Sequence, residues 1–100
     1  MAVVSVLGIR VRSGAEEALV RSFVDLEVFE HARRSGGFRG GRLLRPLAEG
    51  EPFLVVADWD DAASYQGWLD NPVRAELNAK IEPLVAESVP GGGLYEEVSP

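Results

Sequence analysis

The sequence predicts an α+β fold whose elements follow the order β-α-β-β-α-β. In the first segment Val3, Leu7, Ile9 and Val11 alternate with other residues, which is the period of a strand. From Leu19 onward the apolar residues recur at helical spacing. The second half of the chain repeats this succession of a strand, a helical stretch and a strand. Four strands and two helices in this order form the ferredoxin-like arrangement, with an antiparallel sheet covered on one side.

The first half contains two strands and one helix. We expect a strand over residues 2–12 and a capping box in which Ser13 is the N-cap and Glu16 reaches back. A long helix then runs to about Arg34 and ends at the Ser-Gly-Gly of residues 35–37. The second strand spans residues 38–46, although two glycines weaken it.

The second half begins with a polar turn over residues 47–52 and a strand from Phe53 to Trp59. A short helix follows over residues 61–70, capped by Asp60 or Asp61. Asn71 caps the next helix, so the second helical region is split in two. That helix has Pro72 at its first position, ends or kinks at Pro83, and leads through a flexible turn at 91–93 to a strand over 94–98.

The first strand carries apolar residues on both faces, because Ala2, Val4 and Val6 point opposite to the set that begins with Val3. The strand over 53–59 shows the same property, with Leu54 and Val56 opposite Phe53. The helices cover one apolar face of the sheet, so the opposite apolar face needs another partner to cover it. We expect that cover to be the same face of another copy, which gives a homodimer.

Composition indicates one soluble domain over residues 1–100, with 46% apolar and 26% charged residues. The net charge of −6 argues against nucleic-acid binding and against anionic membranes. There is no cysteine, and no apolar run approaches the length of a membrane span. The apolar N-terminus lacks the charged flank of a signal peptide, so we expect a cytoplasmic protein.

The candidate site is an aromatic corner where the strand over 53–59 meets the following helix. Trp59 would line a pocket or move a proton or an electron, or else simply fill the core. The hydroxyl of Tyr65 would bind a substrate carbonyl, or else lie at the surface. Trp68 lies one turn further along the same helix face, and core packing is the simpler interpretation there.

Other polar residues give weaker signals. His31 is the only histidine and is most simply a surface residue near a helix C-terminus, so we expect no metal site. Asp58 shares a register with Leu54 and Val56, and burial there would raise its pKa and make it a candidate base. Residues 36–41 are a helix stop rather than an RGG element, and no nucleotide fingerprint is present, so we expect no bound cofactor.

Several short segments resemble the antibiotic biosynthesis monooxygenase superfamily of dimeric α+β barrel proteins. The resemblance covers nearly the whole chain and rests on IRVRSG (9–14), GFRGGRLLRP (37–46), VVADW (55–59), Tyr65, Trp68-Leu69 and Asn71-Pro72. It implies a ferredoxin-like fold and a homodimer. The superfamily contains oxygenases, cyclases, isomerases and small stress proteins, so the reaction stays open.

Two subgroups can be compared residue by residue. Haem-degrading members use an asparagine, a tryptophan and an axial histidine. The resemblance matches the tryptophan to Trp68, but it places Leu7 near the asparagine position and Asn78 at the histidine position. Quinone-forming members of aromatic polyketide pathways use a tryptophan, a tyrosine, an asparagine and an arginine. Trp59 and Tyr65 match the first two, whereas Val55 stands at the asparagine position, and Asn78, with Arg74 one turn earlier, stands near the arginine position.

The resemblance therefore implies a cofactor-independent monooxygenase that oxidises a phenolic or polycyclic small molecule with O2. The expected catalytic residues are Trp59 and Tyr65, and the expected substrate contacts are Trp68, Asn78, Arg74, Val55 and Leu7. A polyketide cyclase or another non-oxidative tailoring enzyme on the same scaffold is the first alternative. A non-catalytic binding or stress-response dimer is the second.

Overall fold

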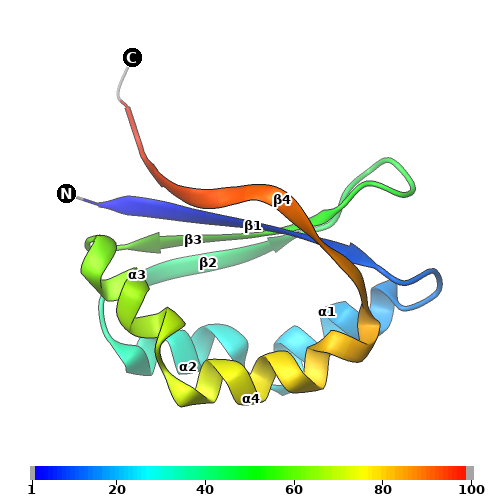
Figure 1. Cartoon of the computed structure of the whole chain (residues 1–100), viewed down its shortest axis with the longest axis horizontal. Coiled ribbons are helices and arrows are strands. Elements are labelled where there is room, and N and C mark those ends of the chain that lie inside the picture. The colour runs from blue at the N-terminus through cyan, green and yellow to red at the C-terminus, as the bar shows by residue number, and fades with distance from the viewer. Residues whose placement is uncertain (1, 99–100) are drawn as a thin grey trace.

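The computed structural model describes residues 2–98, except for the side chains of residues 88–91. A four-stranded antiparallel sheet lies on one side of the molecule and all the helices lie on the other (Figure 1). The elements are β1 (Val3–Val11), α1 (Glu16–Asp25), α2 (Val28–Ser35), β2 (Phe38–Leu44), β3 (Phe53–Trp59), α3 (Ala62–Leu69), α4 (Pro72–Ile81), a 3-10 turn (Glu82–Leu84) and β4 (Val85–Glu96).

The strands lie in the order β2-β3-β1-β4, which confirms the predicted ferredoxin-like α+β fold. β1 pairs with β3 so that Ser5 lies opposite Ala57 and Val3 lies opposite Trp59. Because directly paired residues of an antiparallel sheet point to the same face, the odd-numbered residues of both strands face the helices. The two central strands therefore carry most of the inner wall.

The predicted single helix over 13–34 is wrong, because two helices occupy this region. The chain breaks between α1 and α2 at Glu27, which has a left-handed backbone with φ of 52°. No glycine or proline stands there, so the sequence carried no break signal. The break turns α2 across the sheet, and Phe29 lies beyond it on the wall of the cavity described below.

The predicted capping box is also wrong. α1 begins at Glu16 with Ala15 as its N-cap and no side-chain cap, and the Glu16 carboxylate accepts from the Gly14 N–H at 3.3 Å. The caps of the second half are confirmed. Asp61 accepts from the Ser64 N–H at the start of α3, and Asn71 accepts from the Val73 N–H at the start of α4.

Two strand boundaries differ from the prediction. β2 ends at Leu44 and does not reach Pro46. β4 runs without a turn from Val85 to Glu96, so the glycines at 91–93 lie inside a strand. A side chain on Gly92 would come within 2.7 Å of the Val6 carbonyl oxygen, beside the register shift of β1 against β4. Glycine is required here for a close approach of two strands, not for a turn.

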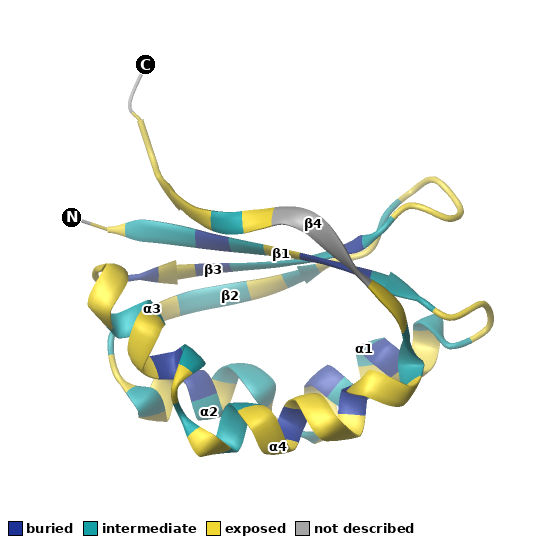
Figure 2. Cartoon of the chain, in the orientation of Figure 1, coloured by how far each residue is buried: buried dark blue, intermediate teal, exposed yellow. Residues whose placement is uncertain are grey.

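The core lies between the sheet and the helices (Figure 2). It consists of two packed clusters of buried residues, one containing Ala32, Phe38, Ala57, Trp59, Trp68 and Leu77 and the other Ile9, Leu19, Phe23, Phe53 and Ile81. The opposite sheet face is apolar as well: Val4, Val6, Leu54 and Val56 are half-buried there, and Leu44 is 38% exposed. No element of the described chain covers that outer face.

Candidate functional site

A cavity of about 90 Å³ lies between the inner face of the sheet and the helices. One water needs roughly 10–15 Å³ by the same measure, so the cavity has room for several waters or a small ligand. Its lining is mostly apolar and is drawn from β1, α1, α2, β2, β3, α3 and α4. The lining residues are Ser5, Leu7, Ile9, Phe23, Val28, Phe29, Ala32, Phe38, Val55, Ala57, Trp59, Tyr65, Trp68, Arg74, Leu77, Asn78 and Ile81.

All seven site residues expected from the sequence line this one cavity. Leu7 comes from β1, and Val55 and Trp59 come from β3, on the helix-facing register. Tyr65 and Trp68 come from α3, and Arg74 and Asn78 come from α4. The split between α3 and α4 allows two short helices to present these four side chains from different directions.

Trp59 lies at the end of β3 and is only 1% exposed. Its indole N–H donates a hydrogen bond of 3.0 Å to Oγ of Ser5 on β1. The indole N–H is therefore already occupied, and Trp59 presents its ring to the cavity. A buried polar bond between two central strands also fixes the orientation of the indole.

A row of aromatic rings runs through the core and ends at Tyr65. The ring centroids of Phe29 and Phe38 are 5.9 Å apart, those of Phe38 and Trp59 are 5.3 Å apart, and those of Trp59 and Tyr65 are 5.6 Å apart. The last two pairs are tilted or edge-to-face, which aromatic quadrupoles favour. These rings give the cavity a largely aromatic lining.

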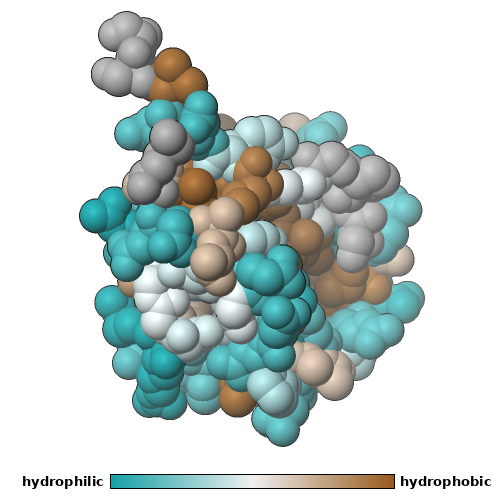
Figure 3. Space-filling view, turned by 60° about the vertical axis from the view of Figure 1, so that its left-hand side comes forward, coloured by the Kyte–Doolittle hydropathy of each residue, from teal (hydrophilic) through white to brown (hydrophobic). Residues whose placement is uncertain are grey.

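The cavity opens toward a surface groove between α4 and strands β1 and β4. The groove shares Leu7, Ile9, Arg74, Asn78 and Ile81 with the cavity. Leu7 is 37% exposed and Asn78 is exposed, as expected for residues at an opening. Figure 3 shows hydrophobic atoms in a hollow bordered by hydrophilic surface. Arg74 therefore brings one basic side chain to an entrance that Asn78 and Glu82 also line.

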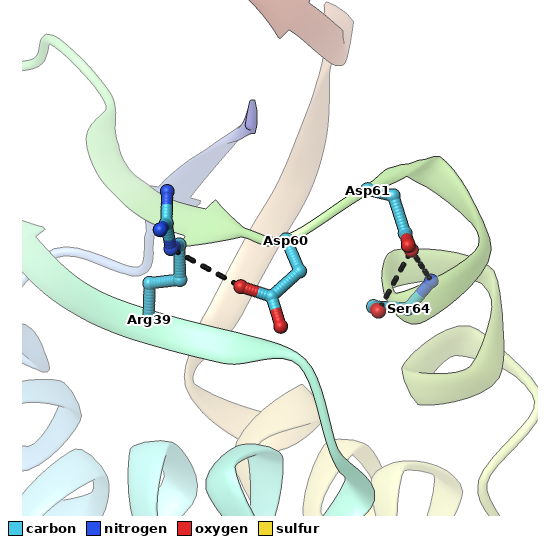
Figure 4. Close-up of polar contacts among 4 residues, drawn as sticks. All are labelled: Arg39, Asp60, Asp61 and Ser64. Atoms are coloured by element: carbon cyan, nitrogen blue, oxygen red, sulfur yellow. Dashed lines mark hydrogen bonds and ion pairs between the residues drawn. The ribbon is translucent and has the colours of Figure 1, made fainter. Parts of the chain in front are cut away.

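The carboxylates of residues 58–61 do not form a catalytic cluster. Asp58 shares the register of Leu54 and Val56, but that register points away from the helices and Asp58 is exposed, so the burial that would make it a candidate base is absent. Asp60 forms an ion pair of 3.1 Å with Arg39, and Asp61 caps α3 (Figure 4). The hydrogen bonds from the backbone N–H and hydroxyl of Ser64 lower the pKa of Asp61 below 3.8.

His31 lies on α2, is half-buried, and does not line the cavity. Within residues 2–98, no group of three His, Cys, Asp or Glu side chains is placed to hold a metal ion. No helix in that part of the chain has the length and apolar character needed to cross a membrane.

Two parts of the site were not foreseen from the sequence. Ser5 is the one buried polar residue among those whose side chains are described. A serine at an inward position of an otherwise apolar strand was the signal available for it. The wall formed by Phe29 and Phe38 could not be foreseen, because it depends on the helix break at Glu27 and on the register shift in β2.

Comparison with known proteins agrees with this fold. The family model described as antibiotic biosynthesis monooxygenase matches residues 2–80. A curated relative, the heme oxygenase (mycobilin-producing) of Mycobacterium tuberculosis, is 36% identical over an alignment of 98 residues that covers 96% of this chain and 87% of the relative.

Solved structures show the same fold. SnoaB, a cofactor-independent oxygenase from Streptomyces nogalater, matches with a TM-score of 0.80 and 22% identity over 99% of this chain and 95% of its own. The heme-degrader MhuD from Mycobacterium tuberculosis, with two hemes bound in its active site, matches with a TM-score of 0.76 and 28% identity over 98% and 97% of the two chains.

Proposed function

The chain belongs to the antibiotic biosynthesis monooxygenase family, and we propose that it is a cofactor-independent monooxygenase acting on a phenolic or polycyclic small molecule with O2. The observation that carries the proposal is the composition of the cavity. It joins aromatic and aliphatic side chains to a few polar groups, and its lining within the described residues contains no histidine. Such a site binds a planar aromatic molecule and orients it by its oxygen atoms.

The proposed chemistry requires binding and proton control from the protein and electrons from the substrate. The anionic form of an anthrone-like phenol donates electrons to O2. The reacting CH2 becomes C=O, and the second oxygen atom leaves as water, so the substrate carbon supplies all four electrons. The cation of Arg74 at the entrance would favour that anion by lowering its pKa. Tyr65 would hold a substrate oxygen, and the apolar walls would exclude water.

Haem degradation is the rival function, because the 36% identical relative is a heme oxygenase. Haem iron is held by His, Cys, Met or Tyr side chains. The chain has no cysteine, His31 lies off the cavity, and Tyr65 is the one lining residue of these four types. We therefore expect no tight haem binding.

A haem titration tests this expectation. Mixing the protein with haem should give no sharp one-to-one shift of the Soret band. A ligated spectrum that disappears in Tyr65→Phe would contradict the expectation and favour the relative's reaction. Tyr65→Phe is informative because it removes the oxygen ligand and keeps the ring.

Oxygen consumption separates the proposal from the cyclase and from a non-catalytic dimer. An oxygen electrode should record protein-dependent uptake with an anthrone-like phenol, one O2 per substrate molecule. Aldol-type product without oxygen uptake would identify the cyclase, and tight ligand binding without any turnover would identify a binding protein.

We also propose that the protein is a homodimer joined through the outer sheet face. The support is the row of apolar side chains at Val4, Val6, Leu54 and Val56, which no helix covers. Covering such a face in two copies would bury on the order of 1,000 Å² or more, which is the scale of stable interfaces. The inner cavity of each copy would remain between its own sheet and helices.

A further inference from the structure

We propose that the hydroxyl of Ser5 donates a hydrogen bond to an oxygen atom of the ligand inside the cavity, away from the groove, with Trp59 as the positioning residue that holds this hydroxyl in place. This inference rests on the proposed function and narrows it, since it requires a ligand with a carbonyl or phenolic oxygen on the edge that enters first.

The Ser5 side chain is in an unusual setting for a serine. It is 7% exposed, it lies on a central strand, and its strand neighbours on the same face are Val3 and Leu7. Its cross-strand partner on β3 is Ala57. Burying a hydroxyl costs free energy unless the hydroxyl is hydrogen-bonded, so a buried serine in apolar surroundings requires a partner.

The bond to Trp59 uses only part of what the hydroxyl offers. An indole N–H can only donate, so Oγ of Ser5 is the acceptor in the 3.0 Å contact. The hydroxyl proton takes no part in that bond and remains a donor. Accepting from the indole also polarises the O–H group, which makes it a better donor to a further acceptor.

The position of Ser5 in the cavity decides which end of a ligand it meets. Ser5 and Trp59 line the cavity but not the groove at its mouth, whereas Arg74 and Asn78 line both. Ser5 therefore lies inside the cavity and away from the groove, whereas Arg74 and Asn78 lie at the groove. A ligand that enters between α4 and the sheet meets the Ser5 hydroxyl last, after its ring plane has passed between the apolar walls.

The test compares two ligands that differ in one oxygen atom. 1-Tetralone carries a carbonyl, which can only accept a hydrogen bond, and tetralin is the matching hydrocarbon. Binding of each to the full chain is measured by isothermal titration calorimetry. The variants are Ser5→Ala, which removes the hydroxyl, and Ser5→Thr, which keeps it; Ala63→Ser, on the exposed surface of α3, is the control for adding a hydroxyl elsewhere.

The wild-type protein should prefer 1-tetralone over tetralin by about 2- to 12-fold, the range that one neutral hydrogen bond gives. Ser5→Ala should abolish the preference, Ser5→Thr should retain it, and Ala63→Ser should not change it. Loss of packing in Ser5→Ala would weaken both ligands alike and leave their ratio unchanged, so an unchanged ratio overturns the proposal. Equal binding of both ligands to the wild type, or binding of neither, also overturns it.

Oxygen uptake is measured separately on the same variants. A lost ketone preference together with no oxygen uptake in any variant would support the Ser5 contact and reject the monooxygenase. A retained preference in Ser5→Ala with normal uptake in the wild type would reject the Ser5 contact and keep the monooxygenase.

Discussion

Individual side chains at the aromatic corner have separable roles. Trp59 is almost fully enclosed and its N–H is bonded to Ser5, whereas Tyr65 is half-buried, and both side chains line the cavity. The two rings lie 5.6 Å apart, so a change in one is felt by the other through packing. Substitutions that keep a six-membered ring are therefore the informative ones.

Tyr65→Phe should reduce turnover several-fold with little change in thermal stability. The substitution keeps the ring against Trp59 and removes one hydroxyl, and a neutral hydrogen bond is worth about 0.5–1.5 kcal/mol. Steady-state kinetics and the melting temperature, measured on one preparation, check both parts. Wild-type turnover in this variant would show that the Tyr65 hydroxyl does not contact the substrate.

Trp59→Phe should act mainly on stability. It leaves a void in the core and leaves Ser5 without its indole donor, which together should lower the free energy of unfolding by about 1–3 kcal/mol. Urea denaturation measures this loss. A protein of undiminished stability that has lost all turnover would instead assign proton or electron transfer to Trp59 itself.

At the scale of helices and strands, some features are set by neighbouring residues in the sequence and others by tertiary packing. The caps at Asp61 and Asn71 could be predicted, because a short polar side chain before an apolar helical stretch satisfies free N–H groups wherever it occurs. The break at Glu27 could not be predicted, since it depends on how α2 packs across the sheet. The glycines inside β4 were misread for a similar reason, because the close approach of Gly92 to β1 is a tertiary contact.

The distinction between features set by local sequence and features set by tertiary contacts also holds within the site. Trp59, Tyr65 and Trp68 were recognisable because a strand end and the first turns of a helix lie close together in any such fold. Asp58 was misplaced because periodicity gives the register of a strand but not which face of the sheet the helices cover.

The N-cap of α3 predicts a specific acid sensitivity. Hydrogen bonds from Ser64 lower the pKa of Asp61 below 3.8, so the charged form is favoured in the folded state. Its contribution to stability is complete above 3.8 and is lost as the pH falls through the lowered value. Asp61→Asn keeps a capping oxygen but does not titrate.

Melting temperatures of the wild type and Asp61→Asn should therefore differ most near neutral pH, with the wild type more stable, and converge in strong acid. Circular dichroism at pH 6 and at pH 2 is sufficient for the comparison. Two curves that stay parallel over this range would show that the charge of Asp61 does not stabilise α3.

At the scale of the whole molecule, the sheet has two apolar faces with different roles. The inner face forms the cavity with the helices, and the outer face is available for a second copy (Figure 1). Val56 lies near the middle of that outer face, paired with Val6 on β1 and with Arg42 on β2.

Val56→Asp should convert the proposed dimer to a monomer, because a carboxylate would be buried at the centre of the proposed interface. Val24→Asp is the matched control, since Val24 is 69% exposed on α1, away from the sheet face. Sedimentation velocity at micromolar concentration gives the answer. A wild-type protein that sediments as a monomer would reject the proposed interface, and dissociation by Val24→Asp would place the interface elsewhere.

Under the proposed function, the protein transfers an oxygen atom from O2 to a phenolic substrate bound in this cavity, without a cofactor. Mass spectrometry of the product formed under ¹⁸O2 tests it most directly, using wild type, Ala57→Leu to fill the cavity, and Ala63→Leu as the exposed control. One labelled oxygen atom per product is expected from the wild type and from Ala63→Leu, at a rate that Ala57→Leu abolishes. Product without label, or equal labelling rates in all three proteins, would contradict the claim.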